Sequence, residues 1–265
     1  MKSAALPAPL PLDVRLMNGV TALLLAAALL LALGAALVWA ARLPLFAIRG
    51  VTVTGDVAHY NAITLRANVM PHLQGTFFTL DLRATRKVFE SVPWVRKAVV
   101  RREFPNRLRV QLEEHRAVAF WGAEGDMRLV NNFGEVFEAN VGELEQDDLP
   151  RLNGPEGQSV QVLAMQQTLQ PVFARMDLTI EQLELTARGG WRARLDSGTA
   201  LELGSGESDE LVARAQRFLS TVTQVTARYQ RSPDQLASAD LRHKDGYAMR
   251  LDGVSTFSAD DVKKK

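Results

Sequence analysis

An uncharged apolar stretch from Leu16 to Ala41 constrains this chain more than any other feature. A helix needs about 20 apolar residues to cross the hydrocarbon core of a bilayer, and this stretch is longer. It lacks the polar face that a surface helix of a globular domain would show. A cleaved signal peptide is the alternative, because Val38 and Ala40 resemble a small-x-small cleavage site, but such apolar regions usually hold only about 7–15 residues. We therefore predict a retained transmembrane helix over residues 16–42.

The charges at the two ends of this stretch say little about its orientation. Lys2 and Arg15 precede it, and Arg42 and Arg49 follow it, so the positive-inside rule gives nearly a tie. Long domains translocate largely regardless of charge, so a short tail followed by a long remainder favours an N-in, C-out topology. Residues 1–15 are rich in proline and predict a disordered cytoplasmic tail.

The composition excludes several classes of function. The chain has no cysteine, which rules out disulfides, thiolate catalysis and cysteine metal sites. Its formal net charge is +1, so electrostatics give no argument for nucleic acid as a partner.

The segment after the apolar stretch predicts a small α+β domain. Residues 46–54 and 94–102 are rich in β-branched residues, and residues 107–113 alternate strictly between apolar and polar side chains. Residues 60–69 have helical periodicity, and Asp81 is placed to cap a second helix that ends near Ser91. The resulting order, β-α-α-β-β, predicts two helices on one face of a three-stranded sheet.

Four short motifs in this region carry a resemblance to a known family. They are Phe77-Phe78-Thr79-Leu80-Asp81, Val92-Pro93-Trp94-Val95, Arg102-Glu103-Phe104-Pro105-Asn106-Arg107-Leu108, and Glu114 to Trp121. Together they resemble the POTRA domain of the FtsQ/DivIB family of bacterial division proteins, which implies such a domain over residues 46–116. Phe104 stands where that family usually has Trp, and Ala117-Val118 replaces a frequent Pro-Val.

The distal part of the chain predicts a β-rich domain with two long helices, over residues 117–252. A hairpin is expected around the turn that begins at Asn131, where the family often has Asp. Helices are expected over 163–176 and, capped by Ser208, over 208–229. Strands are expected over 180–186, 191–195 and 200–203, with a closing hairpin of 236–242 and 247–251. These segments resemble the second domain of the family. Residues 253–265, which end in three lysines, predict a disordered tail.

The residues offer no constellation for catalysis, cofactor binding or metal binding. The histidines are scattered without the i+3 or i+4 spacing that places two ligands on one helix face. No Gly-x-Ser-x-Gly elbow occurs, and the glycines at 204 and 206 run into acidic residues that would repel a phosphate. Asp147 and Asp148 are adjacent acids, but they lie in a polar loop and are interpreted as solvated surface. We predict that the chain is not an enzyme.

The resemblance implies a non-catalytic bitopic scaffold of the divisome that links early and late division proteins. It implies a single-pass protein of the inner membrane at the division septum, with its bulk in the periplasm. It also implies that the second domain binds FtsB, and through it FtsL, by adding a strand at its C-terminal edge, where unpaired backbone groups supply hydrogen bonds. The residues carried over for this edge are Asp240, Leu241, Arg242, His243, Gly246, Tyr247, Ala248 and Met249. A second candidate surface is basic and comprises Arg101, Arg102 and Arg107.

Two alternatives remain at this point. A membrane-anchored periplasmic enzyme acting on envelope polymers would need a carboxylate or serine constellation that the sequence does not display. A transport-type POTRA protein would lead into a membrane barrel, and the residues after Trp121 predict too few strands and two long helices.

Overall fold

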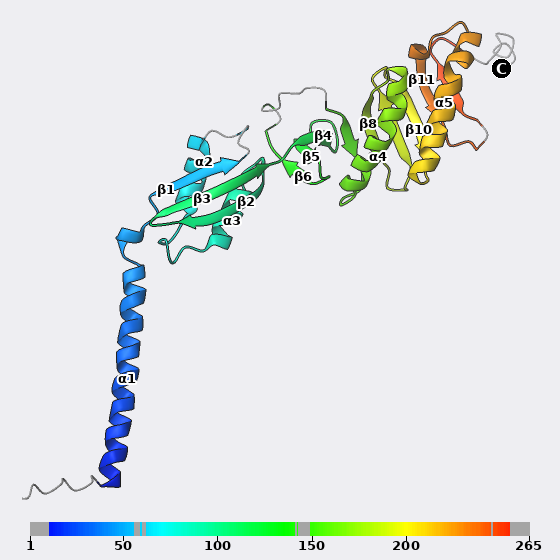
Figure 1. Cartoon of the computed structure of the whole chain (residues 1–265). Helices are drawn as coiled ribbons and strands as arrows, with labels where there is room; N and C mark the ends of the chain where they lie inside the picture. The colour runs from blue at the N-terminus through cyan, green and yellow to red at the C-terminus, as the bar shows by residue number, and fades with distance from the viewer. Residues whose placement is uncertain are drawn as a thin grey trace, which may run out of the picture. The chain divides into compact units, whose positions relative to one another are not determined.

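The computed structural model describes residues 11–55, 59, 62–140, 142, 149–244 and 246–254. Asp147 and Asp148, most of the predicted N-terminal tail and nearly all of the predicted C-terminal tail lie outside these residues. By contacts the chain divides into two compact units, Met1–Glu113 and Glu114–Lys265. Each unit is described by itself, and Figure 1 shows the elements of both.

The first unit begins with one long helix, α1 (Leu12–Ala41), which has 30 residues. It starts four residues before the predicted span, so that Asp13 and Arg15 lie in its first turn. Within the described residues it is the one helix long and apolar enough to cross a membrane. Its large apolar side chains are exposed, as expected of a helix whose solvent is lipid. A short 3-10 helix, η1 (Pro44–Phe46), follows it.

The remainder of this unit has the predicted β-α-α-β-β order. Its elements are β1 (Gly50–Gly55), α2 (Ala62–Val69), η2 (Met70–His72), α3 (Leu82–Glu90), β2 (Val95–Glu103) and β3 (Arg107–Glu114). The described strands form a sheet of order β1-β3-β2, and β1 runs parallel to β3 with Gly50 opposite Arg107. Strand β1 begins at Gly50 rather than Phe46, because Phe46 belongs to η1 and Ala47 bridges to Thr76 instead.

The predicted alternation of β3 builds the core of the first unit. Leu108, Val110 and Leu112 are buried, and the residues between them are exposed. These side chains share a cluster with Phe89 of α3. Asp81 caps α3 as expected, because its Oδ1 accepts hydrogen bonds from the amides of Arg83 and Ala84 at 2.8 and 3.2 Å. Those hydrogen bonds hold the pKa of Asp81 below its ordinary value.

The second unit contains a long mixed sheet. Its described strands have the order β12-β11-β10-β9-β8-β7-β4-β5-β6. They are β4 (Ala117–Trp121), β5 (Arg128–Asn131), β6 (Val136–Glu138), β7 (Arg151–Asn153), β8 (Ile180–Leu185), β9 (Trp191–Leu195), β10 (Ala200–Gly204), β11 (Leu236–Asp240) and β12 (Ala248–Leu251). The helical elements are α4 (Ser159–Phe173), η4 (Ala174–Met176), α5 (Ser208–Arg228) and η5 (Pro233–Gln235).

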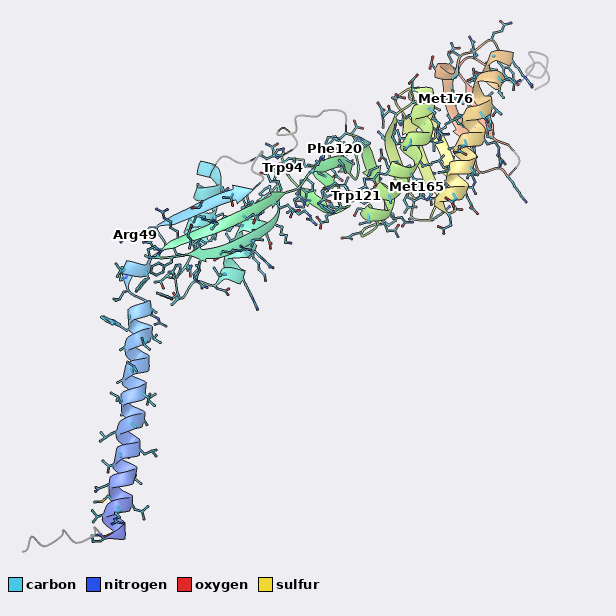
Figure 2. All side chains as sticks on the ribbon, in the orientation of Figure 1. Arg49, Trp94, Phe120, Trp121, Met165 and Met176 are labelled. Atoms are coloured by element: carbon cyan, nitrogen blue, oxygen red, sulfur yellow. The ribbon has the colours of Figure 1, made fainter. Side chains whose placement is uncertain are left out.

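Helices α4 and α5 lie side by side over one face of the part of the sheet that contains β7, β8 and β10 (Figure 1). Strand β9 shows the consequence most clearly, because Trp191, Ala193 and Leu195 are buried while the arginines between them are exposed. From the helix side, Met165 of α4 joins the same core as Trp121 of β4 (Figure 2). The opposite face of β9 is polar and exposed.

Two expectations about the helices of this unit are wrong in detail. Ser208 is the first residue of α5 rather than its cap, because Glu207 occupies the N-cap position without a side-chain hydrogen bond. Helix α4 begins at Ser159, earlier than the predicted residue 163. The Ser159 hydroxyl donates to the Gly134 carbonyl at 2.7 Å, and this bond fixes the start of the helix against the β5–β6 turn.

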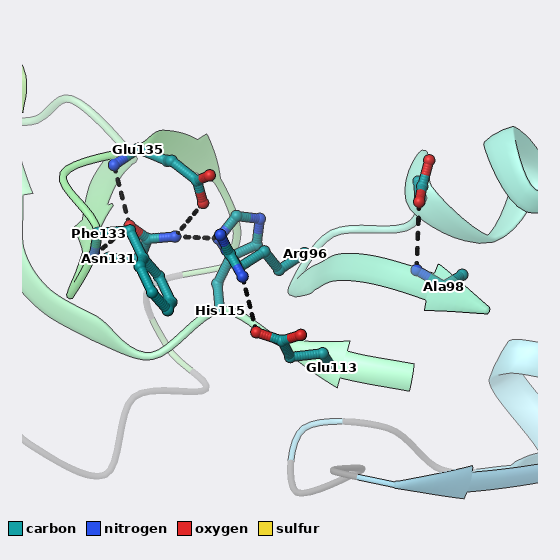
Figure 3. A network of polar contacts seen from close by, with 8 residues as sticks. Arg96, Ala98, Glu113, His115, Asn131, Phe133 and Glu135 are labelled. Atoms are coloured by element: carbon teal, nitrogen blue, oxygen red, sulfur yellow. Dashed lines mark hydrogen bonds and ion pairs between the residues drawn. The ribbon is translucent and has the colours of Figure 1, made fainter. Parts of the chain in front are cut away.

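A buried asparagine organises that turn. Asn131 is fully buried, and its side-chain oxygen accepts hydrogen bonds from the amides of Phe133 and Glu135, both at 2.9 Å. Its side-chain nitrogen donates to Glu135 Oε2 at 2.6 Å and lies 2.9 Å from His115 Nδ1 (Figure 3). The two backbone donors fix which end of the amide is the oxygen. The side chain therefore satisfies its hydrogen-bonding capacity inside the turn.

Candidate partner interface

The C-terminal edge of the large sheet is strand β12. It pairs with β11 in antiparallel register, with Asp240 opposite Ala248 and Ala239 opposite Met249. No further described strand pairs with the other side of β12. In an antiparallel strand about half of the residues direct their N–H and C=O groups away from the existing partner. The outer side of β12 therefore carries backbone donors and acceptors that no described strand pairs with.

The predicted edge residues occupy three different positions around this strand. Ala248 and Met249 lie in β12 itself, and Asp240 ends β11, one strand further in. Leu241 is buried, and its amide donates to the Glu202 carbonyl of β10 at 2.8 Å. Asp240 and Leu241 therefore support the edge, whereas Ala248 and Met249 form it.

An ion pair closes the end of β11. The Arg242 guanidinium donates to both carboxylate oxygens of Asp240, from Nε at 2.8 Å and from Nη2 at 2.5 Å. These hydrogen bonds lower the pKa of Asp240 from 3.8 to about 2, against the opposing effect of burial. The Arg242 side chain crosses directly over Gly204, which has φ of +82°, and a Cβ there would lie only 2.8 Å from Arg242 Cγ. Glycine at 204 thus permits both the left-handed turn and the arginine above it.

Helix α5 holds the connection between β11 and β12. The Tyr247 ring packs edge-on against Phe218, with ring centroids 5.2 Å apart, and its hydroxyl lies 3.0 Å from Thr221 Oγ1. Arg217 donates from Nη1 to the Lys244 carbonyl at 2.5 Å. These contacts fix the segment that leads into β12 against α5.

The other two predicted residues, His243 and Gly246, lie in this connection, where His243 is exposed and Gly246 is half-buried. Sequence reasoning missed Arg217 and Thr221, which come from a helix distant in sequence. It also missed Arg250, an exposed residue of β12 that its alternation with Met249 and Leu251 could have indicated.

The three arginines of the second candidate surface differ in their contacts. Arg102 is used within the first unit, where Nε donates to the Phe77 carbonyl at 2.5 Å and Nη2 to the Leu80 carbonyl at 2.6 Å. Arg101 and Arg107 are exposed. Among the described residues, no group of three or more acidic or histidine side chains is arranged to hold a metal ion.

Comparison with known proteins connects both units to one family. The C-terminal domain model of cell division protein FtsQ/DivIB matches residues 119–242, and the FtsQ-type POTRA domain model matches residues 46–115. The chain is 40% identical to the cell division protein FtsQ of Thiomonas arsenitoxydans over 257 residues, covering 95% of this chain and 92% of that protein. It is 39% identical to FtsQ of Burkholderia pseudomallei, covering 96% and 99% of the two chains, and 33% identical to FtsQ of Bordetella pertussis, covering 95% and 96%. The chain therefore belongs to the FtsQ/DivIB family of cell division proteins.

Proposed function

We propose that this non-catalytic divisome protein acts as a bitopic scaffold that captures an FtsB/FtsL-type partner by strand addition at β12. In this proposal α1 anchors the chain in the inner membrane with the N-terminus inside, and both units stand in the periplasm at the septum. The observation that carries the proposal is the outer edge of β12, unpaired within the described residues and held in place by α5. Family membership rules out the envelope-enzyme alternative.

Backbone pairing alone would make this interaction weak. Strand β12 has four residues, so an added strand gains about four hydrogen bonds at about 0.5–1.5 kcal/mol each. The sum, about 2–6 kcal/mol, corresponds to a dissociation constant no tighter than about 40 µM. Side chains around the edge must therefore add affinity and select the partner. We propose that Tyr247, Ala248 and Arg250 do so.

The basic surface of the first unit remains a second proposed contact. Arg101 and Arg107 are exposed and suit an acidic partner segment. In this proposal Arg102 does not pair with the partner as Arg101 and Arg107 do, because its guanidinium already donates to two backbone carbonyls. A charge reversal at Arg101 or Arg107 is expected to slow association more than it weakens the final complex.

Co-purification with FtsB- and FtsL-type proteins tests the proposed edge. Tyr247→Lys removes the aromatic contact with Phe218 and is expected to abolish capture, whereas Tyr247→Phe keeps the ring and retains most of it. Val136→Lys is the matched control, because Val136 is an exposed residue of β6, the strand at the opposite end of the sheet. Capture by Tyr247→Lys at the wild-type level, with the variant folded by circular dichroism, would refute this edge.

A further inference from the structure

Four phenylalanines form a continuous cluster in the first unit. The ring centroids of Phe46 and Phe78 are 4.9 Å apart, those of Phe77 and Phe78 are 5.2 Å apart, and those of Phe77 and Phe104 are 6.0 Å apart. All three pairs meet edge to face, an arrangement that aromatic rings favour. The cluster joins η1, the loop before α3 and the β2–β3 turn, which are distant in sequence.

Two rings of this cluster are exposed, whereas Phe77 is buried and Phe46 is half-buried. Phe104 is 75% exposed, Phe78 is 52% exposed, and neighbouring Leu45 of η1 is 66% exposed. A single exposed apolar residue needs no explanation, but several in contact mark a surface that meets a protein or a membrane. The position of the cluster in the first unit decides between these two partners.

The cluster is tied to the end of the apolar helix. The Thr76 hydroxyl donates to the Ala41 carbonyl, in the last residue of α1, at 2.7 Å, and the Phe77 amide donates to the Phe46 carbonyl at 2.7 Å. With 30 residues, α1 is about 45 Å long, which matches a bilayer including its headgroup layers, about 40–45 Å. The end of α1, and with it the cluster, therefore lies at the level of the headgroups.

Charge beside the cluster suits anionic lipid. Arg42 follows α1 directly and is exposed, as is Arg49. The Arg49 amide donates to the Asn106 carbonyl at 2.9 Å, which places this arginine beside the turn that carries Phe104. Figure 2 shows Arg49 just beyond η1. Glu103, the acid next to Phe104, is paired with Arg109 at 2.6 Å.

The cluster is also presented rigidly. Arg102 bonds the carbonyls of Phe77 and Leu80 and so fixes the loop that carries Phe77 and Phe78. The Thr79 hydroxyl accepts a hydrogen bond from the Thr76 amide at 2.9 Å within the same loop. Side chains that are already held in place lose little entropy when they enter the boundary between headgroups and acyl chains.

We propose that the exposed rings of this cluster, Phe78 and Phe104, insert into the headgroup–acyl boundary of the leaflet in which α1 ends, and so dock the first unit on the membrane. Arg42 and Arg49 contact anionic headgroups around these rings. The inference rests on the membrane anchor of the proposed function and is independent of strand addition at β12.

Site-directed fluorescence in vesicles tests this docking, and the absence of native cysteine makes labelling specific. The full chain is reconstituted in phosphatidylcholine vesicles with and without phosphatidylglycerol, and the polarity-sensitive dye NBD is attached to Phe104→Cys or, as a second site, Phe78→Cys. The matched control is Lys97→Cys, an exposed residue of β2, the strand that leads into Phe104, about 23 Å back along it. Quenching is measured with aqueous iodide and with lipid that carries a spin label near the headgroup.

Dye at residues 104 and 78 is expected to be quenched several-fold less by iodide, and several-fold more by spin-labelled lipid, than dye at residue 97. Anionic lipid is expected to increase the difference. Equal iodide quenching at residues 104 and 97 would overturn the proposal. Protection from iodide without quenching by labelled lipid would also overturn it, because a protein would then cover the cluster. Flotation of the vesicles checks the anchor separately, since a chain that fails to float shows that α1 does not hold it in the bilayer.

Discussion

Replacing Asn131 by aspartate should destabilise this chain, although the family often has Asp at the corresponding position. In this protein the Asn131 nitrogen donates to Glu135 Oε2 at 2.6 Å and lies 2.9 Å from His115 Nδ1. A carboxylate would keep the two bonds from the backbone amides but would turn an oxygen toward the Glu135 carboxylate. One charge-assisted hydrogen bond, worth about 1.5–3 kcal/mol, would become a repulsion.

The size of this effect is limited by solvent. Glu135 is exposed and can turn its carboxylate toward water, so the repulsion at contact distance is not felt in full. We expect Asn131→Asp to lower the free energy of unfolding by about 2–3 kcal/mol at pH 8. Two carboxylates that share a site raise the pKa of one of them above its unfolded value. The folded variant then binds more protons than the unfolded chain, so the loss should shrink as the pH falls toward 5.5.

Urea unfolding of the full chain in detergent micelles, followed by tryptophan fluorescence at pH 8 and 5.5, measures this effect. Trp121 in β4 is a suitable reporter, because it is buried and lies opposite Arg128 of β5. The double variant Asn131→Asp/Glu135→Gln restores a donor facing the new carboxylate and should recover most of the loss. An equal loss at both pH values, or no recovery in the double variant, would refute the reasoning.

Two further substitutions concern the support of the C-terminal edge. Asp240→Asn should lower the free energy of unfolding by about 1 kcal/mol at pH 7, allowing for solvent around the ion pair. Because the folded pKa is depressed to about 2, this contribution is present above pH 3.8 and is lost as the pH falls through 2, so denaturation of wild type and variant should converge there. Phe218→Ala removes a ring that is only 1% exposed and packs on Tyr247, and should cost about 3–5 kcal/mol in urea unfolding. An unchanged midpoint for Phe218→Ala would show that α5 does not hold this edge.

Local patterns in the sequence were enough to predict much of the first unit. The strict alternation of Leu108, Val110 and Leu112 defines a half-buried strand, and the carboxylate of Asp81 next to a helical pattern defines a cap. Both signals depend on residues that lie within a few positions of each other in the sequence. The structure confirms the strand and the cap, because such short-range signals agree with the fold around them.

The order of strands in the second unit could not be predicted in the same way. Strand β7 has only three residues and pairs in parallel with both β4 and β8, which are distant from it in sequence. The sequence does not predict this strand, because periodicity is not visible over three residues. Without β7, the sequence gives no indication that β4 and β8 belong to one sheet.

The candidate site was predicted as a contiguous stretch, and the structure divides it. Asp240 and Ala248 lie opposite each other on neighbouring strands, so only one of them belongs to the outermost strand. The contributions of Arg217 and Thr221 depend on how α5 crosses the sheet, which no local pattern encodes. The resemblance to a family supplied the region, and the geometry assigns each residue a position within it.

Hydrogen exchange of the full chain, alone and mixed with the proposed FtsB/FtsL-type partner, tests the central claim most directly. Outward-facing amides of β12 exchange with solvent in the free chain and would be bonded to the added strand in the complex. We predict that protection appears on residues 247–251 when the partner binds, and that β6 at the opposite end of the sheet is unchanged. A complex that forms while the amides of 247–251 exchange as in the free chain would contradict the account.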